Sequence, residues 1–242
     1  MQIDISELAE AFPEFRVAVV LFDGLSIPPI RPEPLDRAIA EREAAALERF
    51  GATELSAIDG VAAWRRAYRA FGIKKTSYRS SVERLMKNVL AGRRLPGING
   101  FVDAYNAVSL AHVLPIGADD LDHVAGDIAF RFARPGDSFL DMAGGEDGEG
   151  GAGEDPPKPG EVVYADGEKV LCRRWNWRQD MRSLVLPATR RAVVTIQSNG
   201  WGSVEAAADD LLRLVAGTSG GRAAVFVAGR DRPRVEIVPP AV

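Results

Sequence analysis

Hydrophobic positions follow two periods along the chain, one typical of strands and one of helices. Residues 15–22 form a short, β-branched apolar run closed by Asp23-Gly24, which predicts a buried strand. Further strands are predicted at 128–133, 161–165, 193–197, 223–228 and 234–238. Helices are predicted at 35–50, 58–71, 101–114 and 204–216, and another begins with a capping box at Ser80 and Glu83. Clustered helices with scattered strands favour an α+β fold, in which a largely antiparallel or mixed sheet packs with helices.

The segment 141–160 interrupts this pattern. It contains seven Gly, three Pro and six acidic residues, a composition that cannot bury apolar surface. We therefore expect a flexible acidic loop at this point and not a domain boundary. Because no internal repeat is visible either, we expect a single domain over residues 1–242.

The composition is that of a globular protein, with 46% hydrophobic and 26% charged residues. No apolar run approaches the roughly 18–20 residues needed to cross a bilayer. The first ten residues are acidic where a signal peptide would be basic and then apolar, so we expect a cytoplasmic protein without membrane contact. A single cysteine and two histidines exclude a disulfide framework and argue against a structural zinc site. We expect no metal and no cofactor.

The net charge of −4 conceals two basic segments on an acidic chain. Residues 61–94 contain ten Lys or Arg and one acid, and residues 169–191 contain seven and one. This segregation indicates either a polyanionic partner or solvated faces whose charges pair with acids elsewhere. In the first segment Trp64, Tyr68 and Phe71 share one helix face, which we interpret as core, while the cations point elsewhere.

The second basic segment interleaves arginine with tryptophan. In a strand over residues 172–179, Trp175 and Trp177 would share one face, and Arg174, Asn176 and Arg178 the other. Aromatic and arginine side chains together suit unpaired nucleic-acid ends, although a half-buried strand with a polar outer face produces the same pattern. The arginines next to Cys172 would lower the pKa of its thiol.

Two runs carry a resemblance to a known family. LPGINGFVDAYNAV at 95–108 and PIGADDLD at 115–122, with weaker matches at 126–128, 131–136 and 163–166, resemble the B3/B4 domain of the phenylalanyl-tRNA synthetase beta subunit. That module removes wrongly attached amino acids. The resemblance is clearest over residues 64–180, and it implies a B3/B4-like fold. With 242 residues there is no room for the ATP-dependent core of the ligase, so we expect a free-standing relative.

The resemblance also implies a pocket and shows where this chain departs from the family. Asn106 falls where the family has an editing-pocket Asn, and Asn99 lies in the same signature. Tyr105 replaces a Thr of that pocket, and Gly117 replaces a His. Near Gln179 the family supplies a Glu, which this chain lacks. Loss of such hydrogen-bonding groups changes substrate choice, so we expect a misacylated substrate other than one carrying tyrosine.

The implied function is trans-acting hydrolysis of mischarged aminoacyl-tRNA, and the alternative is a catalytically silent tRNA- or RNA-binding module. Without an obvious general base, we expect Asn106 and Asn176 to position water and the acyl group together with backbone amides. The expected substrate pocket contains Asn99, Tyr105, Gly117 and Gln179. Contacts to the tRNA near its aminoacylated 3′ end are expected from Arg65, Arg66, Lys74, Lys75, Arg173, Arg174 and Arg178. We expect no DNA partner. A third class, a small-molecule pocket protein, requires both basic segments to be paired internally.

Overall fold

A four-stranded antiparallel sheet lies at the centre of the protein, which is described by a computed structural model over residues 1–75, 77–141 and 153–240. Its strand order is β11 (Arg222–Ala228), β2 (Phe15–Asp23), β10 (Arg191–Asn199) and β3 (Ile116–Asp120). Strand β2 pairs along its whole length with β10, and seven of its nine residues are buried. Burial on both faces explains why this strand is a nearly continuous apolar run.

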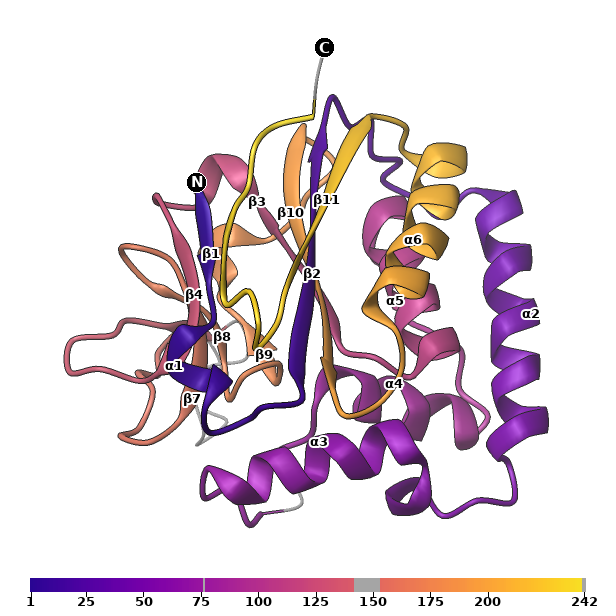
Figure 1. Ribbon diagram of the computed structural model, residues 1–242. Coiled ribbons are helices and arrows are strands. Elements are labelled where there is room, and N and C mark those ends of the chain that lie inside the picture. Colours follow the sequence, from indigo (N-terminus) through magenta and orange to yellow (C-terminus); the bar gives the residue numbers. More distant parts are fainter. Residues whose placement is uncertain (76, 142–152, 241–242) are drawn as a thin grey trace.

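A six-stranded mixed sheet lies on one side of the central sheet (Figure 1). Its order is β12 (Arg234–Glu236), β1 (Gln2–Asp4), β4 (Ile128–Phe132), β7 (Val162–Ala165), β8 (Val170–Arg173) and β9 (Arg178–Gln179). Strands β1 and β4 are parallel, and the other neighbouring pairs are antiparallel. Two further short strands, β5 (Leu140–Asp141) and β6 (Gly153–Glu154), pair antiparallel with each other. Together with the helices, these sheets form the predicted α+β fold.

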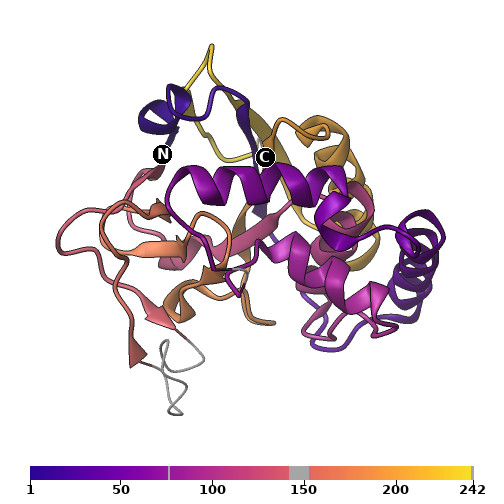
Figure 2. The same cartoon turned by 90° about the horizontal axis from the view of Figure 1, so that it is seen from below.

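Helices cover the other side of the central sheet. Helices α5 (Gly100–His112) and α6 (Val204–Thr218) pack on that side, and α2 (Glu33–Phe50) packs outside α5. Helices α3 (Asp59–Ala70) and α4 (Ser81–Leu90) lie across one end, as Figures 1 and 2 show. Helix α5 contacts α2, α6 and β3, and ten of its thirteen residues are buried. That position explains its nearly uniform apolar character. Short helical segments complete the chain: α1 (Ser6–Ala9), η1 (Leu55–Ala57), η2 (Leu121–His123) and η3 (Met181–Ser183).

The aromatic face of α3 belongs to the core, as predicted. Trp175 is completely buried, and its ring makes edge contacts with Phe12, Phe15 and Trp64 at centroid distances of 4.7–5.1 Å. Tyr68, one turn further along α3, is buried as well. Aromatic rings in this arrangement add stabilisation beyond the area that they bury.

The predicted strand over residues 172–179 is wrong. Residues 174–177 form a turn between β8 and β9, and Arg174 and Trp175 have left-handed backbone conformations, with φ of 46° and 69°. Strict alternation of faces therefore does not apply. The aromatic cluster that receives the Trp175 ring is the physical reason, because side-chain burial offsets the cost of a positive φ.

The acidic segment 141–160 lies only partly within the described residues, since 142–152 fall outside them. The described remainder includes the β5–β6 pairing and Asp155, which pairs with Arg173. Over the described ranges, no helix combines the length and the apolar character that crossing a bilayer requires. The single-domain organisation stays a prediction.

Candidate functional site

A cavity of about 210 Å³ lies between α5, β3 and the β8–β9 hairpin, and we call it the Asn106 cavity. Six segments of the sequence contribute to it because the central sheet, α5 and the six-stranded sheet meet at this point. Its polar lining includes Tyr105, Asn106, Asp119, Tyr164, Asn176, Gln179, Thr195 and Gln197. Ile98, Val102, Ile116 and Leu171 supply much of the apolar lining.

Asn106 contributes a polar side chain to the Asn106 cavity, and Gly117 leaves space open in it. Asn106 is half-buried on α5, and within the described residues its amide makes no hydrogen bond. Gly117 lies on β3, where a Cβ atom would meet no other atom within 4 Å. Tyr105 adds a buried phenol to the same wall, and its pKa is raised by burial and by the nearby Asp119 charge. An unengaged amide beside unfilled space is suited to contact a ligand.

Asn176 and Gln179 also line the cavity, but their amides are held by the protein. The Asn176 Oδ1 accepts a hydrogen bond from the Tyr68 hydroxyl at 2.9 Å, and its Nδ2 donates to Gln197 Oε1 at 3.0 Å. Gln179 Nε2 donates to the Ala118 carbonyl and to Asp119 Oδ1. These hydrogen bonds fix the side chains of Asn176 and Gln179, which therefore shape the cavity wall. Each amide has few donor or acceptor positions left to bind a ligand.

Asn99 does not line the cavity, which corrects its assignment to the substrate pocket. It is the N-cap of α5, where its Oδ1 accepts from the backbone N–H groups of Phe101 and Val102. Its Nδ2 donates to the Val185 carbonyl at 3.1 Å. Asn is favoured at this position because it satisfies backbone donors that the helix leaves free, and capping accounts for this residue.

Asp119 is one of several cavity residues, with Tyr164, Thr195 and Gln197, that are not among the site residues expected from the sequence. Its Oδ1 accepts hydrogen bonds from the Ser183 hydroxyl at 2.7 Å and from Gln179 at 2.8 Å. Burial raises the pKa of its carboxyl group to about 7. One signal for it exists in the sequence: in a strand over 116–120, Gly117 and Asp119 share a face.

Cys172 lines the same cavity as a neutral thiol. Burial raises its pKa, and the nearby charge of Asp119 raises it further. The expectation that Arg173 and Arg174 lower this pKa is therefore wrong. Their guanidinium groups are engaged with Glu161, and desolvation of the thiol outweighs them.

Arg173 and Arg174 are also unsuited to bind tRNA, contrary to expectation. Arg173 is 0% exposed, and its Nε and Nη2 donate to Glu161 at 3.1 and 2.8 Å. Arg174 is 1% exposed, lies 3.3 Å from the same carboxylate, and stacks on the rings of Tyr78 and Trp177. Buried guanidinium groups need such partners, and paired in this way they present no charge to a phosphate.

Of the other five residues expected to contact tRNA, two form ion pairs with acidic residues, and three are exposed cations without such an ion pair among the described residues. Arg65 pairs with Glu83 at 2.7 Å, and Arg178 pairs with Asp141. Arg66, Lys74 and Lys75 are exposed, as is Arg69 beside them, and none of these four makes an ion pair with the described residues. The second basic segment is therefore largely neutralised within the fold, and the first keeps a group of open cations on α3 and the loop after it.

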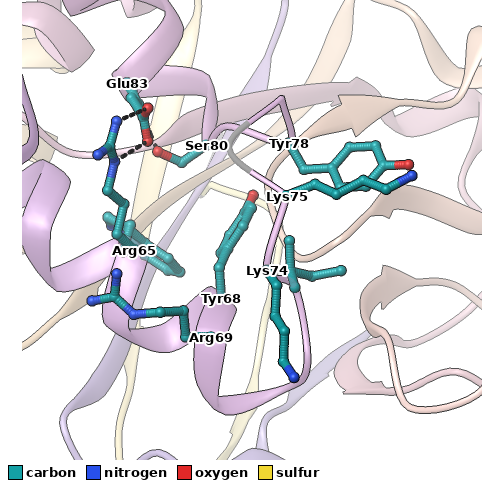
Figure 3. A pocket seen from close by; sticks show the side chains of 10 residues that line it. Arg65, Tyr68, Arg69, Lys74, Lys75, Tyr78, Ser80 and Glu83 are labelled. Atoms are coloured by element: carbon teal, nitrogen blue, oxygen red, sulfur yellow. Dashed lines mark hydrogen bonds and ion pairs between the residues drawn. The ribbon is translucent and has the colours of Figure 1, made fainter.

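Three of these open cations, Arg69, Lys74 and Lys75, line a small hollow of about 70 Å³, which we call the cationic pocket. Figure 3 shows Arg65 joined to Glu83 at one side and Lys75 lying along the ring of Tyr78 at the other. Arg69 and Lys74 extend from the rim. Flexible cations around a concave surface match the charge of a phosphate backbone.

The cationic pocket and the Asn106 cavity share a wall. Tyr68 lines the pocket, and its hydroxyl donates to Asn176, which lines the cavity. The neighbouring residues Ser80 and Ser81 line the pocket and the cavity respectively. The fold thus places exposed positive charge next to a partly apolar cavity of side-chain size.

Among the described residues, no three or more His, Cys, Asp or Glu side chains lie together in a group that could hold a metal ion. The groups that line the Asn106 cavity include amides, phenols and the Asp119 carboxylate. Such groups bind and orient a ligand through hydrogen bonds, and a carboxylate also exchanges a proton near neutral pH.

Comparison with known proteins identifies the family. Residues 63–210 match the family described as the B3/4 domain. Among solved structures, the chain is similar to an N-terminal fragment of the phenylalanyl-tRNA synthetase beta-subunit from Pyrococcus horikoshii, with 14% sequence identity and a TM-score of 0.45. That similarity covers 91% of this chain and 50% of the other, so the protein spans half the length of that fragment. No curated protein matches the sequence. Since the family match extends over more than half of the sequence, the chain belongs to the B3/4 domain family.

Proposed function

We propose that the protein hydrolyses mischarged aminoacyl-tRNA in trans, in the cytoplasm, with the acyl group in the Asn106 cavity and phosphates on the open cations beside it. The observation that carries the proposal is that the unengaged amide of Asn106 lines a cavity with open space at Gly117. These two residues belong to the signature that resembles the editing module. The cavity is of the size that an amino-acid side chain requires, and the exposed cations adjoin it.

Ester hydrolysis at a tRNA 3′ end needs a positioned water and stabilisation of the oxyanion. In the proposed reaction, water adds to the ester carbonyl, the bond to the ribose oxygen breaks, and that oxygen leaves with a proton. The Asn106 amide donates to the acyl carbonyl or holds the water, while Asn176 and Gln179 keep the wall in place. Gly117 leaves room for the side chain of the acyl group.

The first test follows loss of the acyl group from a panel of correctly and wrongly charged tRNAs. Hydrolysis of one misacylated species is expected, and Asn106→Ala is expected to lower its rate by about 10²-fold or more, since removal of one such donor has this effect. Asn88→Ala is the matched control, because Asn88 lies on α4 and bonds Arg93 away from the cavity. Equal rates for Asn106→Ala and the wild type would refute this role.

The open cations predict salt-dependent tRNA binding. Four phosphate contacts from Arg66, Arg69, Lys74 and Lys75 give a slope of log affinity against log salt of roughly −2.8 to −3.6. The double variant Lys74→Ala/Lys75→Ala is expected to reduce the magnitude of this slope by about 1.4–1.8. Filter-binding assays at several salt concentrations measure the slope for the wild type and the variant. Lys87→Ala removes an exposed cation that lines neither the pocket nor the cavity, and it should leave the slope unchanged.

A second candidate is a protein whose cavity binds a free small molecule, which requires both basic segments to be paired internally; the second segment meets this requirement, whereas the first keeps open cations. Arg173, Arg174 and Arg178 are all neutralised by acids of the same chain. Salt-independent or absent tRNA binding would support that candidate. Salt-dependent tRNA binding without hydrolysis of any charged tRNA would instead support a catalytically silent tRNA-binding module.

A further inference from the structure

Asp119 is a buried carboxylate whose charge has no direct counterion among the described residues. It is 3% exposed and forms no ion pair with them. Ser183 and Gln179 both donate to Oδ1, and no described group donates to Oδ2. A buried charge without a counterion destabilises the folded protein, and a ligand that supplies the missing partner removes this cost.

A second buried group in the same cavity also lacks a partner. Tyr164 on β7 is 2% exposed, and its hydroxyl makes no hydrogen bond to any described residue. The ring is stacked on Phe130 at a centroid distance of 4.7 Å, which fixes its position. An unsatisfied buried hydroxyl costs free energy, and together with Asp119 it forms an unfilled polar subsite in a largely apolar wall.

The surrounding charges leave this subsite net negative when Asp119 is ionised. Lys169 donates to Asp166 at 2.7 Å and to a backbone carbonyl, and Arg178 pairs with Asp141, so neither cation is directed at Asp119. Burial raises the Asp119 pKa to about 7. The titratable or charged groups around Asp119 are Tyr105, Tyr164, Asp166, Lys169, Cys172 and Arg178.

We propose that Asp119 and Tyr164 form a subsite for a primary ammonium group of the ligand that occupies the Asn106 cavity. An ammonium group has three N–H donors and a positive charge, so it supplies the donor that Asp119 Oδ2 lacks and the bond that the Tyr164 oxygen lacks. The subsite stands independently of hydrolysis. That this ligand is an aminoacyl group rests on the proposed function. In that case the ammonium group is either the α-ammonium group of the amino acid or the ammonium group of a basic side chain.

Three small amides distinguish these sources by calorimetric titration of the full-length protein. Norleucinamide carries only an α-ammonium, N-acetyl-lysinamide carries only a side-chain ammonium, and N-acetyl-norleucinamide carries neither. One of the two amines is expected to bind at least about tenfold more tightly than the neutral amide, since a hydrogen bond to a charged group has this effect. Equal affinity for all three amides, or no binding of any, overturns the proposal.

Binding is also expected to depend on pH. A bound cation lowers the pKa of Asp119, so the complex forms with release of a proton, and affinity rises by up to about tenfold per pH unit between pH 5 and 7. Titrations in two buffers of different ionisation enthalpy count the released proton in the wild-type protein. An α-ammonium loses its own proton near pH 8, so affinity for norleucinamide should fall above that pH, whereas affinity for N-acetyl-lysinamide should not. If the affinity for the amine does not change with pH, the proposal is overturned.

Asp119→Asn keeps the shape of the side chain and is expected to weaken amine binding at least about tenfold and to remove its pH dependence. Because the variant lacks the uncompensated charge, it should melt at or above the wild-type temperature at pH 8, which shows that it is folded. Asp122→Asn, at an exposed carboxylate three residues away, should bind as the wild type does. Unchanged amine binding by folded Asp119→Asn overturns the proposal. These assays contain no tRNA, so failure of hydrolysis and failure of the subsite are separate results.

Discussion

Replacing Glu161 with glutamine is expected to lower the free energy of unfolding by about 3–5 kcal/mol, because it removes a buried carboxylate charge that pairs with two buried guanidinium groups. Glu161 accepts two hydrogen bonds from Arg173 and lies 3.3 Å from Arg174. Asp155 also pairs with Arg173, but it cannot replace the contact to Arg174. In a chain of this length the loss corresponds to a fall in melting temperature of roughly 6–20 °C.

Thermal unfolding followed by circular dichroism measures this change, and Glu168→Gln is its control. Glu168 lies in the turn between β7 and β8, and its side chain is exposed, so the same substitution should alter the free energy of unfolding by no more than about 0.5 kcal/mol. A melting temperature of Glu161→Gln equal to that of the wild type would mean that the buried pair contributes nothing.

This pair shows where prediction from the sequence fails. The letters around Arg173 and Arg174 describe a basic, aromatic-rich stretch, and nothing local indicates that both guanidinium groups are buried. The acids that neutralise them, Asp155 and Glu161, lie 12 or more residues earlier and reach them only after β7 and β8 have paired. Charge segregation along a chain thus does not by itself indicate charge segregation on the surface.

Local signals were sufficient for the helices. The capping box predicts the start of α4, where the Ser80 hydroxyl accepts from the Glu83 backbone N–H at 3.4 Å. Gly72, with a φ of 91°, follows the end of α3 as expected of a glycine in a left-handed conformation. Caps and amphipathic periods act within a few residues, so they can be identified without knowledge of the tertiary structure.

Strand β3 and the cavity that it lines depend on distant partners. Its residues 116–120 include one Gly and two Asp, which are poor strand formers, and β3 exists because it pairs with β10. The sequence predicts Asn106 and Gly117 as site residues through the family resemblance, and both line the cavity. Asp119 accepts hydrogen bonds from Gln179 and Ser183, which lie some 60 residues further along the chain, so its place in the site depends on the tertiary structure.

Filling the Asn106 cavity from Gly117 should abolish hydrolysis without unfolding the protein. A side chain at this position meets open space, so Gly117→Leu is expected to occupy the volume assigned to the acyl group. Misplacement of a substrate by about 1 Å can cost 10²-fold in rate, and we expect at least that loss in the deacylation assay. The melting temperature should be unchanged or higher, because a glycine in a strand is replaced.

Gly217→Leu provides the matched control for this experiment. Gly217 also has open space at its Cβ, but it lies on the exposed side of α6 and does not line the cavity. Its variant should hydrolyse the substrate as the wild type does. Gly117→Ala adds one methyl group and should reduce the rate less than Gly117→Leu. The two variants together show how the hydrolysis rate depends on the cavity volume that remains for the acyl group. Full activity in Gly117→Leu would place the acyl group outside the Asn106 cavity, and the open cations of α3 would then be the starting point for locating it.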